Sequence, residues 1–172
     1  MKHYAFFSQT GSEIATIARR LGRWPDKIIT NERPERLRTI SPKLAGIDII
    51  YLSNKPTVEE YLEVLGTEPC KVTLHGWLRI MPPEVIAIHP NMFNGHPGLI
   101  TEHPILKGKD PQEKAYNLGL TVSGCVIHQV TVGVDEGPIL EERMVEIKNL
   151  SLDEVYSELH KTSIDLWVEF LK

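Results

Sequence analysis

Three polar side chains stand out among apolar neighbours in the second half of the chain: Asn94, His96 and Asp135. Asn94 and His96 are two residues apart, so on an extended segment their side chains project from the same face. Pro97 follows directly and ends that strand. The spacing therefore predicts an amide and an imidazole side by side at the carboxyl end of a strand.

Asp135 lies in the turn 134–138, which closes an apolar run that begins at Gly124. An amide, an imidazole and a carboxylate can serve as oxyanion donor, proton shuttle and orienting group in acyl transfer. Without the aspartate, the other two residues fit a turn-forming asparagine and a surface histidine. The Asp135 turn, together with the motif resemblance given below, favours the catalytic interpretation over that simpler one.

The length and composition indicate a single soluble domain. The chain has 172 residues, which suffices for an adequate core, and a formal net charge of −4. The charges are scattered, which disfavours duplex nucleic acid as a partner. No apolar run approaches the roughly 20 residues that span a bilayer, and Met1–Phe7 is too short for a secretory signal. Cys70 and Cys125 could pair, but such low cysteine usage fits a reducing compartment better, so we expect one cytoplasmic domain of residues 1–172.

Strands and helices alternate through the first two thirds of the chain. Short apolar runs predict strands at residues 4–7, 27–30, 47–52, 71–74 and 92–94. Helical spacing and capping patterns predict helices that begin after Gly11, after Thr57 and after Pro82. The run 47–52 is typical of a buried parallel strand, and the stretch 31–38 is polar. The alternation predicts an α/β, Rossmann-like, doubly wound sheet that is mostly parallel.

The last third of the chain departs from that alternation. A helix is expected after Asp110, followed by two strands, 125–132 and 139–147, that are joined by the Asp135 turn. A capping-box pattern at Ser151 opens a last helix that carries apolar residues at helical spacing. The expected fold is therefore a mostly parallel sheet with a C-terminal β-hairpin and helix.

The motifs resemble those of the folate-dependent formyltransferases. They are Asn-x-His-Pro at 94–97, the segment that carries His128, and Asp-x-Gly-Pro-Ile-Leu at 135–140. Upstream, Gly76–Pro83 resembles the folate segment of that family, and Phe7–Ser12 resembles the first phosphate loop of its glycinamide enzymes. The family includes phosphoribosylglycinamide, methionyl-tRNA and sugar-amine formyltransferases.

The resemblance implies a formyltransferase fold and direct transfer from 10-formyltetrahydrofolate to an amine, without a metal. Asn94 would donate a hydrogen bond to the developing oxyanion. His96 would move a proton from the attacking amine toward the folate nitrogen, and Asp135 would hold and polarise His96. Phosphoribosylglycinamide is the default acceptor, and a nucleotide-linked amino sugar is the second. The alternatives are a 10-formyltetrahydrofolate hydrolase, with water as the acceptor, and a folate- or nucleotide-binding module without catalysis.

The resemblance also assigns binding residues. The donor is expected to contact side chains from the folate segment and from the hairpin, namely Leu78, Arg79, Ile80, Met81, Val132 and Val134. The acceptor phosphate is expected at the start of the first helix, against Gly11, Ser12 and Glu13. Buried core and an ordinary strand-to-helix turn explain the same residues without a ligand. Arg79 is the exception, because a charge within an apolar segment needs a partner.

Three departures from the family pattern concern the acceptor. Glu13 stands where the glycinamide enzymes have asparagine, Gly98 where the family has serine, and Ser163, in a loose alignment, where the glycinamide enzymes have glutamate. A carboxylate at Glu13 would face the phosphate, and one like-charge pair at roughly 5 Å costs on the order of 3 kcal/mol. We therefore expect phosphoribosylglycinamide to be a poor or compensated acceptor.

The remaining histidines suggest simpler roles. We expect His128 to be structural and hydrogen-bonded inside its strand. His89, His96 and His103 recur at even spacing, which invites a zinc site, but a proline follows each of them and breaks any shared helix. The sequence therefore disfavours a metal centre.

Overall fold

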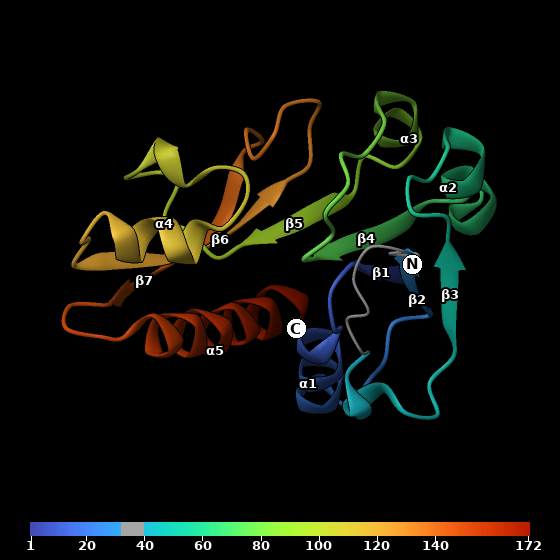
Figure 1. Ribbon diagram of the computed structural model, residues 1–172. Helices are drawn as coiled ribbons and strands as arrows, with labels where there is room; N and C mark the ends of the chain where they lie inside the picture. The colour runs from blue at the N-terminus through green and yellow to red at the C-terminus, as the bar shows by residue number, and fades with distance from the viewer. Residues whose placement is uncertain (32–39) are drawn as a thin grey trace.

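The computed structural model describes residues 1–31 and 40–172, and these residues form one seven-stranded sheet (Figure 1). The strand order is β3-β2-β1-β4-β5-β6-β7. The strands are β1 (Lys2–Phe7), β2 (Lys27–Asn31), β3 (Ile49–Leu52), β4 (Cys70–His75), β5 (Met92–His96), β6 (Val122–Gln129) and β7 (Ile139–Glu146). Strands β1 to β5 are parallel, whereas β6 and β7 pair antiparallel. The predicted α/β sheet with a C-terminal hairpin and helix is therefore confirmed.

Helices cover both faces of the sheet. They are α1 (Ser12–Leu21), α2 (Val58–Leu65), α3 (Pro83–Ile88), α4 (Pro111–Asn117) and α5 (Leu152–Leu171), with short 3-10 turns η1 (Pro42–Leu44) and η2 (Pro104–Leu106). Side chains alternate along each strand, so Phe7 packs against α1, whereas Phe6 packs against α2 and α3 on the opposite face. Helix α5 contacts α1, β6 and β7 (Figure 1). Within the described residues, no helix is long and apolar enough to cross a membrane.

The helix boundaries follow the local signals in the sequence. Thr57 and Glu60 form a complete capping box at the start of α2, and Ser151 and Glu154 form another at the start of α5. In both boxes the hydroxyl accepts from the third backbone N–H, and the glutamate accepts from the cap N–H. Gly22 ends α1 with φ 71°, a conformation that glycine adopts without strain.

The interpretation of 47–52 as a buried strand is wrong. Strand β3 covers only Ile49–Leu52 and forms the edge of the sheet, where Ile50 and Tyr51 are exposed. An apolar run does not reveal how many neighbours a strand has, and among the described residues β3 pairs with β2 alone. The polar stretch 31–38 lies, apart from Asn31, outside the described residues.

Gly95, in the middle of β5, allows α5 to approach the sheet closely. A Cβ at this position would lie 2.6 Å from Nε1 of Trp167, a side chain that is fully buried. The indole therefore packs directly on the strand backbone between Asn94 and His96. The geometry of the strand that carries the predicted catalytic pair thus depends on a contact with the last helix.

We predict that Gly95→Ala lowers the free energy of unfolding by about 1–3 kcal/mol, the usual cost of overpacking a core. Urea unfolding followed by tryptophan fluorescence measures the change. The double variant Gly95→Ala, Trp167→Phe is the control, because the smaller ring should restore part of the loss. If the two substitutions are additive, the proposed packing of the indole on Gly95 is incorrect.

Candidate active site

Four polar side chains meet at the carboxyl end of β5. Asn94 and His96 project from β5, and His128 lies directly opposite Asn94 in the antiparallel pairing with β6. The turn between β6 and β7 brings Asp135 onto the same face, so the three residues predicted from spacing lie together. Asp135 has φ 52°, an uncommon conformation for a residue other than glycine. Hydrogen bonds to its side chain offset the backbone strain, which costs on the order of 1–3 kcal/mol.

Asp135 is the centre of this cluster. Its Oδ1 lies 3.2 Å from His128 Nε2 and 3.4 Å from Asn94 Nδ2. Its Oδ2 accepts a hydrogen bond of 2.8 Å from the Gly108 N–H and lies 3.4 Å from His96 Nδ1. The side chain is only 9% exposed, so the carboxylate exchanges its hydration for these protein groups.

The Asn94 amide nitrogen faces two atoms that lie close to each other, a ring nitrogen and a carboxylate oxygen. Nδ2 is 3.1 Å from His128 Nε2 and 3.4 Å from Asp135 Oδ1, and those two atoms are 3.2 Å apart. The three distances form a nearly equilateral triangle, so the two atoms lie about 60° apart as seen from Nδ2, whereas the two N–H bonds of an amide diverge by about 120°. One N–H therefore points at this pair of atoms and donates to Asp135, and the second is left available to a ligand.

His96 has both ring nitrogens near oxygen atoms. Nε2 donates a 2.6 Å hydrogen bond to the Leu106 carbonyl at the end of η2, and Nδ1 faces Asp135. A backbone carbonyl only accepts, so Nε2 carries the proton in this arrangement. The Leu106 contact was not predicted, and nothing in the sequence marks a carbonyl ten residues away as a partner of His96.

His128 is buried and hydrogen-bonded within the sheet, as expected from the sequence, and its partners belong to the Asp135 cluster. Its Nδ1 lies 3.1 Å from the Gln129 carbonyl oxygen, while Nε2 lies within hydrogen-bond distance of both Asn94 and Asp135. The ring therefore stands between the amide and the carboxylate and fixes the position of both. The antiparallel pairing of β5 with β6 places it there, and recognising the strand partner of Asn94 would have identified it.

Burial and charge oppose each other in this cluster. Burial lowers the pKa of His96, and the nearby Asp135 carboxylate and the Leu106 carbonyl reverse part of that effect, so the pKa stays below its ordinary value. For Asp135, burial raises the pKa, but the hydrogen bond with His128, the charge of His96 and the Gly108 N–H together hold it below its ordinary value. Near neutral pH the cluster thus holds an ionised carboxylate beside a neutral imidazole.

The segments expected to bind the donor present mostly exposed side chains. Apolar side chains that remain accessible to a ligand are those of Leu78, Ile80, Val132 and Val134. Met81 is only 3% exposed and packs in the core with Val85, so it supports the segment from beneath. Arg79 has the partner that its position requires, because its guanidinium donates to the backbone carbonyl and side-chain oxygen of Asn54 at 2.8 and 2.9 Å.

The start of α1 differs from the expectation at one residue. Gly11 is the N-cap with φ 72°, and the Ser12 N–H is bonded to the Thr10 hydroxyl. Glu13 was expected to hold its carboxylate over the helix start, but that carboxylate accepts hydrogen bonds from His75 at 3.1 Å and from Ser163 at 3.2 Å. Two interior partners turn the side chain toward β4 and α5.

The histidines at even spacing do not form a centre. His89 bonds to the Gly66 carbonyl and to Cys70, whereas His96 belongs to the Asp135 cluster. Within residues 1–31 and 40–172, no group of three or more His, Cys, Asp and Glu side chains is arranged to hold a metal ion. Cys70 and Cys125 are free and buried, so the pairing considered from the sequence does not form.

Residues 51–171 match the family model described as formyl transferase. The chain is 35% identical over 102 residues to the trifunctional purine biosynthetic protein adenosine-3 of Bos taurus, covering 59% of this chain and 10% of that protein. It is 26% identical over 138 residues to the methionyl-tRNA formyltransferase of Campylobacter fetus, covering 80% of this chain and 44% of that protein. The chain thus spans less than half the length of these curated relatives.

Solved structures with the same fold support this match. The phosphoribosylglycinamide formyltransferase of Anaplasma phagocytophilum superposes with a TM-score of 0.82 at 22% identity, covering 100% of this chain and 85% of that one. The formyltetrahydrofolate deformylase of Pseudomonas syringae superposes with a TM-score of 0.77 at 19% identity, covering 99% of this chain and 60% of that one. At these identities the superpositions establish the fold. Because the family model spans most of the sequence, including the β5 strand and the Asp135 turn, the chain belongs to the formyl transferase family.

Proposed function

We propose that this chain transfers the formyl group of 10-formyltetrahydrofolate to the primary amine of a small phosphorylated or nucleotide-linked acceptor. The observation that carries the proposal is the partly buried cluster of Asn94, His96 and Asp135 at the carboxyl end of β5, the position where ligands bind in open α/β sheets. Membership of the formyl transferase family supports the donor. Relatives named for purine biosynthesis make phosphoribosylglycinamide the first acceptor to test.

Asn94 stabilises the transition state in this proposal. The amide N–H that serves neither His128 nor Asp135 donates to the oxygen of the formyl group as negative charge develops on it. His128 and Asp135 hold the amide nitrogen on that side, so the donor is oriented before the reactants arrive. Loss of one such donor usually lowers kcat by about 10²–10³.

His96 moves the proton that the reaction must relocate. The acceptor displaces the Leu106 carbonyl from Nε2, and the ring proton then resides on Nδ1, where Asp135 accepts it in a hydrogen bond. The free Nε2 takes a proton from the attacking nitrogen as the new C–N bond forms. It returns that proton to the folate nitrogen as the old C–N bond breaks, so no net proton is gained or lost.

The donor would lie against Leu78, Arg79, Ile80, Val132 and Val134. Four of these are exposed apolar side chains at the carboxyl end of β4 and in the hairpin, and they suit a flat, mainly apolar ring. Arg79, fixed by Asn54, supports the segment that carries two of them. Met81 contributes from the core beneath.

Hydrolysis of the same donor is the second candidate. The formyltetrahydrofolate deformylase of Bacillus subtilis is 28% identical over 92 residues, covering 53% of this chain and 30% of that protein. The same cluster would then activate water in place of an amine. Incubation with 10-formyltetrahydrofolate and an amine panel, followed by mass spectrometry, separates the two. An N-formyl amine supports transfer, whereas formate as the sole product establishes hydrolysis and refutes the transfer proposal.

We predict that His96→Ala and Asp135→Asn lower kcat by about 10²–10⁴, the usual contribution of a general acid–base, and leave donor affinity within a few-fold. Steady-state kinetics and calorimetric titration with the donor measure the two effects. His160→Ala is the matched control, because His160 is exposed on α5 away from the cluster. An equal loss of affinity and turnover would assign the cluster a structural role.

The pH dependence gives a separate test of His96 as the base. Its pKa is lowered, so kcat/KM should stay constant on the acid side down to about pH 6.5 and fall only below it. Asp135 raises the pKa of His96, so Asp135→Asn should move this acid limb to lower pH while reducing the plateau. Asp153→Asn, at an exposed position in α5, should leave the profile unchanged. An acid limb above pH 6.5, or one that Asp135→Asn does not move, argues against His96 as the base.

A further inference from the structure

Strand β7 has a strand partner on one side only. It stands last in the strand order of the sheet, and among the described residues it pairs with β6 alone (Figure 1). The strand has eight residues, which makes it longer than any of the strands β1 to β5. The five side chains from Leu140 to Met144 are all exposed. An open edge of this length is a template on which another strand can pair.

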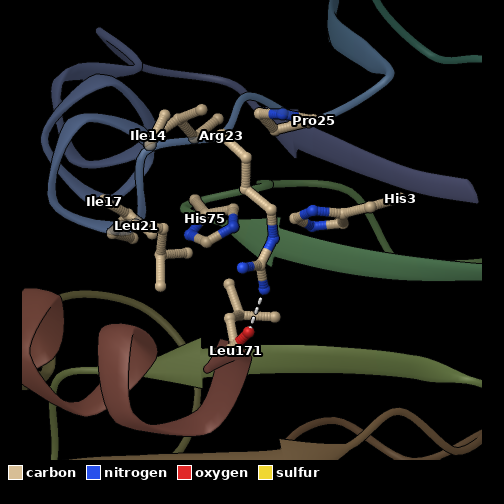
Figure 2. A pocket seen from close by; sticks show the side chains of 9 residues that line it. His3, Ile14, Ile17, Leu21, Arg23, Pro25, His75 and Leu171 are labelled. Carbon is tan, nitrogen blue, oxygen red and sulfur yellow. Dashed lines mark hydrogen bonds between the residues drawn. The ribbon is translucent and has the colours of Figure 1, made fainter.

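The last helix lies over one face of the sheet and does not cover this edge. Helix α5 packs on β6 and β7, and contacts with the first part of the chain fix its C-terminal half. Arg23 donates to the Leu171 carbonyl beside a small cavity between α1 and α5 (Figure 2). Arg20 of α1 also bonds to Asp165 at 2.6 Å. These contacts keep α5 in place, so the outer edge of β7 stays open.

The hydrogen bonds to β6 show which backbone groups of β7 point outward. The Ile147 N–H donates to the Thr121 carbonyl. In an antiparallel pair, residues that bond to the neighbouring strand alternate with residues that do not. Arg143 falls in the bonded series, so the N–H and C=O groups of Glu142 and Met144 face away from β6. A further strand would bond to these outward groups.

One two-fold register of β7 against a second copy of itself gives complementary side chains. With an antiparallel pairing about an axis at Glu142, Leu140 lies opposite Met144 and Glu141 lies opposite Arg143. The two-fold axis repeats each pair, so every contact occurs twice. The first pair joins apolar side chains that are 43% and 58% exposed, and the second joins opposite charges. Glu141 and Arg143 have no ion-pair partner among the described residues, so both are available to a second copy.

The neighbouring registers lack this complementarity. An axis at Arg143 would set two arginines opposite each other and Met144 against Glu142. An axis at Glu141 would set two glutamates opposite each other and again place Glu142 against an apolar side chain. In the register centred on Glu142, the like-charge contact is that of Glu142 with its own copy. The Thr101 hydroxyl donates to this carboxylate at 2.6 Å and compensates part of its charge.

We propose that the free edge of β7 binds a second copy of this chain, so that the two sheets join through an antiparallel β7–β7 pair about a two-fold axis at Glu142. The partner is a copy because one strand supplies both members of each complementary pair. The pairing places a strand on the outer side of the hairpin that carries Asp135. This interface does not rest on the proposed reaction, so its tests need no turnover.

Sedimentation equilibrium measures the dimer, which we expect to form at about 1–100 μM. Arg143→Glu places two glutamates opposite each other at two points of the interface and should weaken the dimer by at least about tenfold. The double variant Glu141→Arg, Arg143→Glu exchanges the two charges, so the complementary pairs form again and the dimer should return. Lys55→Glu is the matched control, because it makes the same change in net charge at an exposed position beside the opposite edge of the sheet.

Two further measurements locate the two-fold axis. Glu142→Gln removes the like-charge contact and should tighten the dimer several-fold. Amide hydrogen exchange at Glu142 and Met144, whose N–H groups point outward, should slow as the protein concentration rises. Exchange at Arg143, which already bonds to β6, should not change with concentration.

Three results would overturn the proposal. The first is a natural chain that sediments as a monomer at about 100 μM. The second is a dimer that Arg143→Glu does not weaken, or that the exchanged pair does not restore while circular dichroism shows the variant folded. The third is protection of the Glu142 and Met144 amides that does not depend on concentration, since the edge is then covered within one chain.

Discussion

The carboxylate of Asp135 is buried, and a buried charge is tolerated only where hydrogen-bond donors surround it. Its surroundings come from four parts of the chain: β5, β6, the segment after η2 and the hairpin turn itself. Removing any one donor would leave the charge less well compensated. The fold of residues 92–140 is therefore constrained by the need to deliver these groups to one point.

The change from parallel to antiparallel pairing at β5 makes that delivery possible. A hairpin joins two antiparallel strands through a turn alone, whereas another parallel crossover would need a helix in between. The turn that joins β6 to β7 begins beside the amino end of β5, where the Val130 N–H donates to the Met92 carbonyl, and from there it brings Asp135 to Asn94 and His96. The sheet topology and the site are therefore linked, because the hairpin of β6 and β7 that completes the sheet also carries the Asp135 carboxylate.

Local patterns predicted the parts of this structure that depend on near neighbours in the sequence. The two-residue spacing of Asn94 and His96 placed both on one face, and both capping boxes appear where Thr57 and Ser151 indicated them. The Leu106 carbonyl and the inward direction of Glu13 could not be predicted, since each depends on a partner supplied by tertiary packing. The exposure of β3 could not be predicted for a similar reason. The sequence of one strand does not show where that strand lies in the sheet.

The contact between Gly95 and Trp167 also limits how this sequence can change over evolutionary time. A lineage that acquires any side chain at position 95 while the indole is present meets an immediate clash. The opposite order of substitutions avoids the clash. A smaller ring acquired first at position 167 leaves a void, and a side chain acquired later at position 95 can fill that void. Relatives with a larger residue in the middle of this strand are therefore expected to carry a smaller or displaced ring in the last helix. The order of the two substitutions, rather than either one alone, decides which sequences are reachable from this one.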